Sequence, residues 1–174
     1  MEKIWLHWTP GVATDVLGNL LAHLPPLIGR TVRLGHRFDL ATAEYQENRP
    51  QYRAATLLNR LCPQKPPGDL LLALTEADLN ALGLAFVYGE ADPAAGGAIL
   101  SLYRFGHHPE RQTPPRSLLL RRTLTEAVHE TGHLLGLEHC RDERCAMFFS
   151  STLEETDRKE PRICELCRCK ARLN

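Results

Sequence analysis

The chain has 174 residues, of which 43% are hydrophobic and 24% are charged, with twelve glycines and twelve prolines. This composition is typical of a globular protein of one domain with a buried core, and it excludes a disordered chain and a collagen-like repeat. Lysine plus arginine and aspartate plus glutamate both total 21, so no global charge attracts nucleic acid or an anionic membrane.

The start of the chain lacks the features of a targeting segment. Its apolar run is interrupted by His7 and ends at Pro10, which is too short and too polar for a signal peptide. No later run approaches the roughly 18 apolar residues of a membrane helix. We therefore expect a cytoplasmic protein in which the six cysteines stay reduced, and their crowding near the C-terminus favours metal or redox chemistry over disulfides.

The first half of the chain predicts strands and helices in alternation. Apolar residues at Ile4, Leu6 and Trp8 alternate with other residues, as in a strand. The helical spacing of apolar residues over 12–24 predicts a helix that Pro25-Pro26 ends. Three further elements are expected: a strand over 31–34, a helix over 52–61 and a strand buried on both faces over 69–74.

The second half predicts two strands and one long helix. Strands are expected over 84–88 and 98–105, with the small residues 89–97 between them as a surface loop. A helix is expected over 118–135, where apolar residues recur every three or four positions. The interleaving predicts a mixed sheet with helices packed on it. Two surface features complete the survey: His107-His108 as exposed loop residues and a solvated basic face from Arg158 to Arg172.

The residues with the clearest chemistry run from His129 to His139. His129 and His133 are four residues apart, so on a helix their imidazoles lie on the same side, where one zinc ion can bridge them. Gly136 allows the helix to end and the chain to bring His139 back to the metal. Three histidines with an open fourth position are typical of a catalytic zinc site, in which Glu130 can act as general base toward the activated water.

A second group of candidate ligands predicts a structural zinc site. Four cysteines form two close pairs along the chain: Cys140, Cys145, Cys164 and Cys167. A metal there would supply the folding free energy that the polar segment 140–174 lacks. Cys169 could replace Cys167 or remain a free thiol, and reduced, uncoordinated thiols are the alternative for the whole group. We expect two zinc ions per chain, one catalytic and one structural.

These motifs together resemble one known family. The three histidines followed by Met147 resemble the metzincin clan of zinc peptidases, in which a turn containing methionine underlies the histidines. The immediate Cys140, the Cys145-x-Met147 unit and the later Cys164-x-x-Cys167 closely resemble the archaemetzincins. The shared motifs span about a third of the chain.

The resemblance implies a fold. It is a compact α/β (α+β) domain with a twisted five-stranded mixed sheet over an active-site helix and one antiparallel edge strand along the upper rim of the cleft. By order along the chain, residues 84–88 are the candidate for that edge, against which an extended peptide would lie. We expect residues 1–174 to form this single domain, with the sheet and helices in 1–139 and a zinc-stabilised segment in 140–174.

Two functions remain open at this point. The first is a zinc-dependent peptidase acting on peptide or protein substrates, and the resemblance also allows aminopeptidase-like activity. The alternative is a peptide-binding or regulatory module that keeps zinc with little or no turnover. A nucleic-acid-binding zinc ribbon is disfavoured by the neutral charge balance and by the lack of interleaved aromatic residues. We expect no nucleic-acid or membrane partner, and a monomer.

Overall fold

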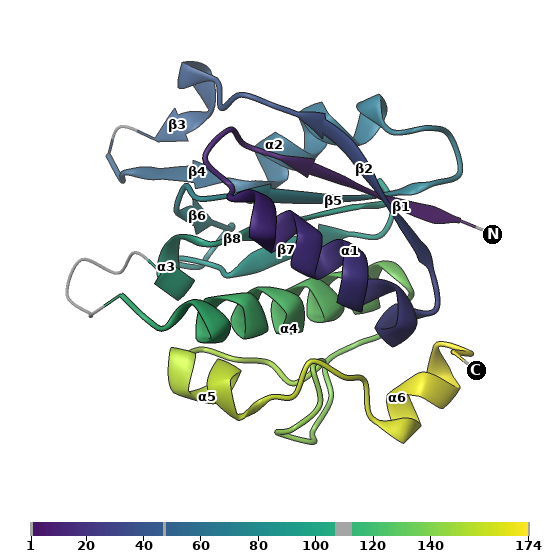
Figure 1. The fold of residues 1–174 in the computed structure, drawn as a ribbon. Coiled ribbons are helices and arrows are strands. Elements are labelled where there is room, and N and C mark those ends of the chain that lie inside the picture. The colour runs from purple at the N-terminus through teal and green to yellow at the C-terminus, as the bar shows by residue number, and fades with distance from the viewer. Residues whose placement is uncertain (1, 47, 107–112, 174) are drawn as a thin grey trace.

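The central feature of the fold is a five-stranded mixed sheet (Figure 1). The computed structural model describes residues 2–46, 48–106 and 113–173, so His107 and His108 lie outside the described residues. The strand order is β2-β1-β5-β8-β7, in which only β7 runs antiparallel to its neighbour. The five strands are β1 (Lys3–Trp8), β2 (Thr31–Arg37), β5 (Leu70–Thr75), β7 (Gly89–Asp92) and β8 (Gly97–Ser101). The expected mixed sheet is confirmed.

The edge strand is not the segment that the sequence predicts. Residues 84–88 form no strand, although Val87 makes an isolated bridge with Leu79 and the Tyr88 carbonyl accepts a hydrogen bond from the Ser101 N–H. The edge is β7, which lies within the predicted surface loop. A hairpin explains the small residues there, because Gly96 turns the chain with a φ of 69° and Asp92 accepts a hydrogen bond from the Ala95 amide.

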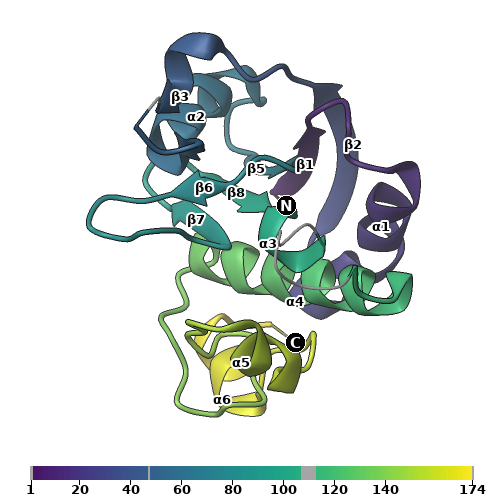
Figure 2. The same ribbon diagram turned by 90° about the vertical axis from the view of Figure 1, so that its left-hand side faces the viewer.

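Helices cover both faces of this sheet (Figures 1 and 2). On one face lie α1 (Thr14–Ile28) and α4 (Arg116–Leu134), and on the other lies α2 (Ala54–Leu61). Strand β5 is buried on both faces, as predicted. Its residues Leu70, Leu72 and Leu74 pack with α1 and α4, whereas its residues Leu71 and Ala73 pack with α2.

Helix α1 continues through the two prolines that are expected to end it. It ends instead at Gly29, whose φ is 62° and whose N–H donates to the carbonyl of Pro25 at 2.9 Å. Leu24 and Ile28 are fully buried in the core on either side of Pro25-Pro26. Burial of this last apolar turn outweighs the hydrogen bonds that the prolines remove.

The remaining elements fill the margins of the fold. The strand expected over 98–105 ends at Ser101, and a short helix α3 (Tyr103–Gly106) follows. A second, unpredicted sheet of β3 (Tyr45–Gln46), β4 (Gln51–Arg53) and β6 (Leu79–Asn80) lies beside α2. Two short helices, α5 (Leu153–Arg158) and α6 (Glu165–Lys170), pass beneath α4 on the side away from the sheet (Figure 2). Within the described part of the chain, no helix combines the length and the apolar character needed to cross a membrane.

Candidate metal centres and active-site cleft

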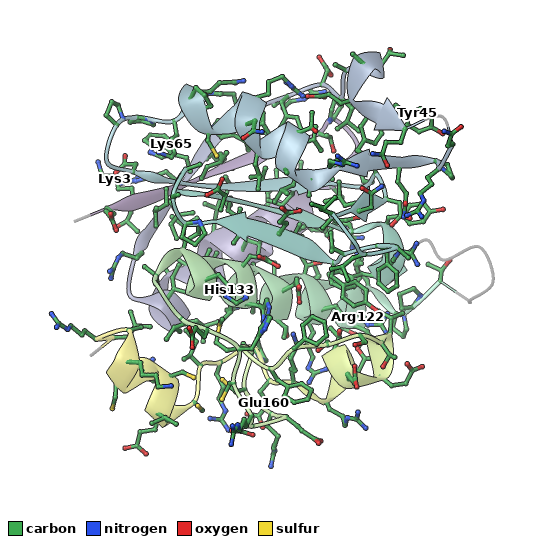
Figure 3. The ribbon with its side chains drawn as sticks, turned by 180° about the vertical axis from the view of Figure 1, so that it is seen from behind. Lys3, Tyr45, Lys65, Arg122, His133 and Glu160 are labelled. Carbon is green, nitrogen blue, oxygen red and sulfur yellow. The ribbon has the colours of Figure 1, made fainter. Side chains whose placement is uncertain are left out.

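The last turn of α4 and the loop after it bring the three predicted histidines together. Gly136 has a φ of 84°, and the N–H of Leu137 donates to the carbonyl of Gly132 at 3.0 Å. This turn returns the chain, so the ring centroid of His139 lies 5.3 Å from that of His129 and 4.9 Å from that of His133. Figure 3 shows His133 near the end of α4, above the C-terminal segment that carries Glu160. One ring nitrogen of each histidine lies within 4.8 Å of the others.

Backbone carbonyls prepare two of these rings to bind a cation. The Nδ1 atoms of His129 and His133 lie 2.7 and 2.8 Å from the carbonyl oxygens of Ala146 and Leu137. A carbonyl only accepts, so each Nδ1 carries the proton and each Nε2 keeps a lone pair. The two Nε2 atoms face each other at 3.1 Å. Two facing lone pairs repel unless a cation lies between them, so the arrangement fits a bound metal ion.

Met147 packs against helix α4 at Gly132, the residue before His133, because residue 132 has no side chain. A Cβ built on Gly132 would lie 2.3 Å from the Sδ atom of Met147. Met147 is fully buried and belongs to the main core with Val128 and Leu137. The methionine therefore supports the last turn of α4, which carries His133, by packing.

Glu130 lies beside the histidines with a buried, unpaired carboxylate oxygen. Glu130 is 3% exposed, and its Oε2 atom has no hydrogen-bond partner among the described residues. Burial, followed by the nearby charge of Glu126, holds the pKa of the Glu130 carboxyl well above its usual value of 4.5. A buried carboxyl group with a raised pKa holds a proton more tightly than an exposed one, which suits a group that accepts and then donates a proton.

Two further charged residues belong to the site, and the sequence patterns do not reveal them. The sequence places Lys159 on a solvated face, but it is 1% exposed and its Nζ lies 3.4 Å from Oε2 of Glu126. Burial raises the pKa of Glu126, but the positive charge of Lys159, together with the nearby His129 and His133, lowers it on balance. Glu126 precedes Glu130 by four residues, which is a usable signal for a shared helix face, whereas nothing near Lys159 marks it as buried.

A cleft of about 750 Å³ opens over these residues. Its lining includes the three histidines and Glu130 on one side and residues 84–91, with β7, on the other. Phe86 and Tyr88 form part of its wall, and Phe149 packs edge-on against His139 at 5.1 Å between ring centroids. The histidine site is therefore open to a ligand of peptide size.

The four predicted cysteines also come together. Their Sγ atoms all lie within 4.8 Å of one another, with Cys145 and Cys167 buried and the other two half-buried. Backbone N–H groups of Asp142 and Cys164 donate to Sγ of Cys140 and Cys145 at 3.4 and 3.3 Å. Such donors stabilise thiolate charge, so the donor set suits a tetrahedral metal.

Burial opposes the ionisation of two thiols in this cluster. It raises the pKa of the Cys145 thiol to about 11 and that of Cys167 further. Buried thiols stay protonated unless a positive charge offsets the cost of ionising them. Cys169 is exposed and lies outside the group, so the geometry favours Cys167 as the fourth member.

Comparisons with known proteins agree with this geometry. The sequence profile of Peptidase family M54 matches residues 22–173. The archaemetzincin of Methanopyrus kandleri is 39% identical over 154 residues, covering 88% of this chain and 85% of that protein. The archaemetzincin of Archaeoglobus fulgidus is 35% identical over 158 residues, covering 91% and 90%.

Solved structures resemble the whole fold. The crystal structure of the Methanopyrus kandleri archaemetzincin matches with a TM-score of 0.86 and 34% identity, covering 98% of this chain and 93% of that one. A zinc-dependent peptidase from Methanocorpusculum labreanum matches with a TM-score of 0.88 and 29% identity, covering 97% and 99%. The chain therefore belongs to the archaemetzincin family of zinc-dependent peptidases, peptidase family M54.

Proposed function

We propose that this chain is an active peptidase in which His129, His133 and His139 hold the catalytic zinc and Glu130 is the general base. The observation that carries the proposal is the facing pair of Nε2 lone pairs, 3.1 Å apart, beside the unpaired Oε2 of Glu130 in an open cleft. A second zinc at Cys140, Cys145, Cys164 and Cys167 would hold the C-terminal segment against α4.

In the proposed chemistry, Glu130 transfers a proton from the attacking water to the leaving group. Zinc, when bound to the imidazoles, would polarise the carbonyl of the scissile peptide bond and favour the ionised form of the nearby carboxylate. Glu130 then takes a proton from the attacking water and passes it to the nitrogen of the leaving amine. Lys159 forms an ion pair with Glu126, whereas the Oε2 atom of Glu130 has no hydrogen-bond partner among the described residues and can take part in the proton transfer.

We propose that the substrate lies along the open edge of β7 as an extended strand. The Ser101 N–H donates to the Tyr88 carbonyl, so Tyr88 hydrogen-bonds to β8. Two residues later, Glu90 lies opposite Ile99 in the same register and also faces β8. Hydrogen bonding alternates along an antiparallel pair, so the backbone groups of Gly89 and Ala91 face away from β8, toward the cleft side. These two residues are the proposed main-chain partners of a bound peptide.

The test is digestion of a diverse peptide mixture by the zinc-loaded protein, read by mass spectrometry beside Glu130→Ala at equal zinc content. Cleavage by the wild type alone supports the proposal, and the products distinguish removal of terminal residues from internal cleavage. If both proteins cleave equally, Glu130 is not the base. If neither cleaves while both hold two zinc ions, the peptide-binding module becomes the better assignment.

A further inference from the structure

Glu130 packs directly on the backbone of the edge strand. A Cβ built on Gly89, the first residue of β7, would lie 2.5 Å from Oε1 of Glu130 and 2.8 Å from both its Cδ and its Cγ. All three of the nearest heavy atoms belong to that one side chain. Real Cβ atoms do not approach other atoms so closely, so any larger residue at position 89 must displace the carboxylate.

The backbone itself gives no reason for glycine at this position. Gly89 is absent from the glycines with positive φ, and its neighbours in β7 pair regularly with β8. Alanine could therefore adopt the same conformation without strain. Glycine is therefore needed at this position for the close approach of Glu130, and not for a turn of the backbone.

Glu130 has little room to move away. It is 3% exposed on α4, and Glu126, one helical turn earlier, contributes a second buried carboxylate within 4.8 Å. The Glu130 carboxyl group is therefore packed between the backbone of Gly89 and the carboxyl group of Glu126. The contact with Gly89 therefore fixes how closely the Glu130 carboxylate approaches β7.

We propose that Gly89 is a positioning residue for Glu130: its bare Cα sets the distance between the general base and a peptide bound along β7. The proposal rests on the proposed function of Glu130, because that distance matters only if the carboxylate takes part in the reaction. The same residue offers its backbone to the substrate and its Cα to the base. One glycine thus aligns both reaction partners.

The first test is Gly89→Ala in the zinc-loaded protein. A displacement of the base by about 1 Å should lower kcat by roughly 100-fold, with a smaller change in KM and with two zinc ions retained. The matched control is Gly18→Ala, because Gly18 is exposed on α1 and has no atom within 4 Å of a built Cβ. A Gly89→Ala variant with unchanged kcat would overturn the proposal.

The second test does not depend on catalysis. The drop in melting temperature caused by Gly89→Ala is measured in the wild type and in the Glu130→Ala background, both loaded with zinc. If Gly89 acts through Glu130, the drop largely disappears in the second background, since the new methyl group fits the space that the carboxylate leaves. Equal drops in the two backgrounds would show a purely structural glycine and overturn the proposal. An inactive wild type would contradict the proposed function. The comparison of melting temperatures would still show whether Gly89 acts through Glu130.

Discussion

His129 donates its Nδ1 proton to the carbonyl of Ala146 at 2.7 Å, and Ala146 directly follows Cys145 of the cysteine cluster. Cys140 in turn directly follows His139, and its N–H donates to the carbonyl of Met147 at 2.9 Å. The two candidate centres therefore share backbone at two places. Loosening the cysteine cluster would release both the orientation of one histidine and the anchor of another.

Replacing Cys164 by serine tests this coupling, because Cys164 lies outside the shared backbone. We expect zinc content to fall from two ions to one and kcat to fall although all three histidines remain. We also expect the free energy of unfolding to fall by about 4 kcal/mol, which lowers the melting temperature by roughly 10 °C for a chain of this size. Zinc analysis and thermal unfolding measure both effects.

Cys169→Ser is the control for that experiment. Cys169 is exposed and lies outside the four-sulfur group, so its replacement should leave zinc content and melting temperature unchanged. A loss of zinc in Cys169→Ser but not in Cys167→Ser would reverse the assignment of the fourth ligand.

Gly132→Ala should destabilise the protein by overpacking. The new methyl group would meet Sδ of Met147 at 2.3 Å in a fully buried position, which costs about 1–3 kcal/mol. Urea unfolding of the zinc-loaded protein measures this cost. In the double variant Gly132→Ala/Met147→Ala the loss should be smaller than the sum of the two single losses, and strict additivity would argue against the contact.

Sequence patterns are informative wherever burial repeats with a regular period. The apolar run over β5 and the helical stripe of α4 follow from periodicity, and the four-residue spacing of His129 and His133 is by itself enough to place them on one helix face. The edge strand β7 has no such pattern. It pairs on one side only and is made of small and acidic residues, which also suit a loop.

Other features depend on contacts between distant residues, which local sequence does not encode. Lys159 is buried only because α5 delivers it to Glu126, 33 residues earlier in the chain. The helix end at Gly29 is missed because local rules for proline ignore the burial of Ile28. The spacing of the candidate metal ligands is thus readable from the sequence, whereas the residues packed around them require the fold.

The buried pair of Lys159 with Glu126 provides a further prediction. Lys159→Met leaves the Glu126 carboxylate buried without its partner, which should cost about 3–5 kcal/mol of stability. The double variant Glu126→Leu/Lys159→Met buries no charge at this position and should recover most of that loss. Urea unfolding curves compare the three proteins, and equal losses in the single and double variants would contradict a role for the pair.

Glu44 predicts a pH dependence of stability far from the metal sites. Burial raises its pKa, but the side chain of Arg60 and the N–H of Ala41 outweigh burial, so the net pKa lies below the usual 4.5. A lowered folded pKa gives stability above pH 4.5 that is lost as the pH falls through the folded pKa. The difference in the free energy of unfolding between wild type and Glu44→Gln should therefore be largest near neutral pH and should shrink toward zero in acid. A constant difference across the titration would contradict this, and zinc release in acid cancels because both proteins share it.

The open edge of β7 can be tested with proline, which removes a backbone donor without adding charge. The N–H of Ala91 faces away from β8, so Ala91→Pro should leave the β7–β8 ladder intact and remove one hydrogen bond to a bound peptide. Loss of about 1 kcal/mol corresponds to a rise in KM of roughly fivefold, with kcat much less affected. Glu90→Pro is the contrasting variant, because the Glu90 N–H faces β8 and its loss should lower the melting temperature. If Ala91→Pro binds and cleaves peptides with unchanged KM, the substrate does not pair with this edge.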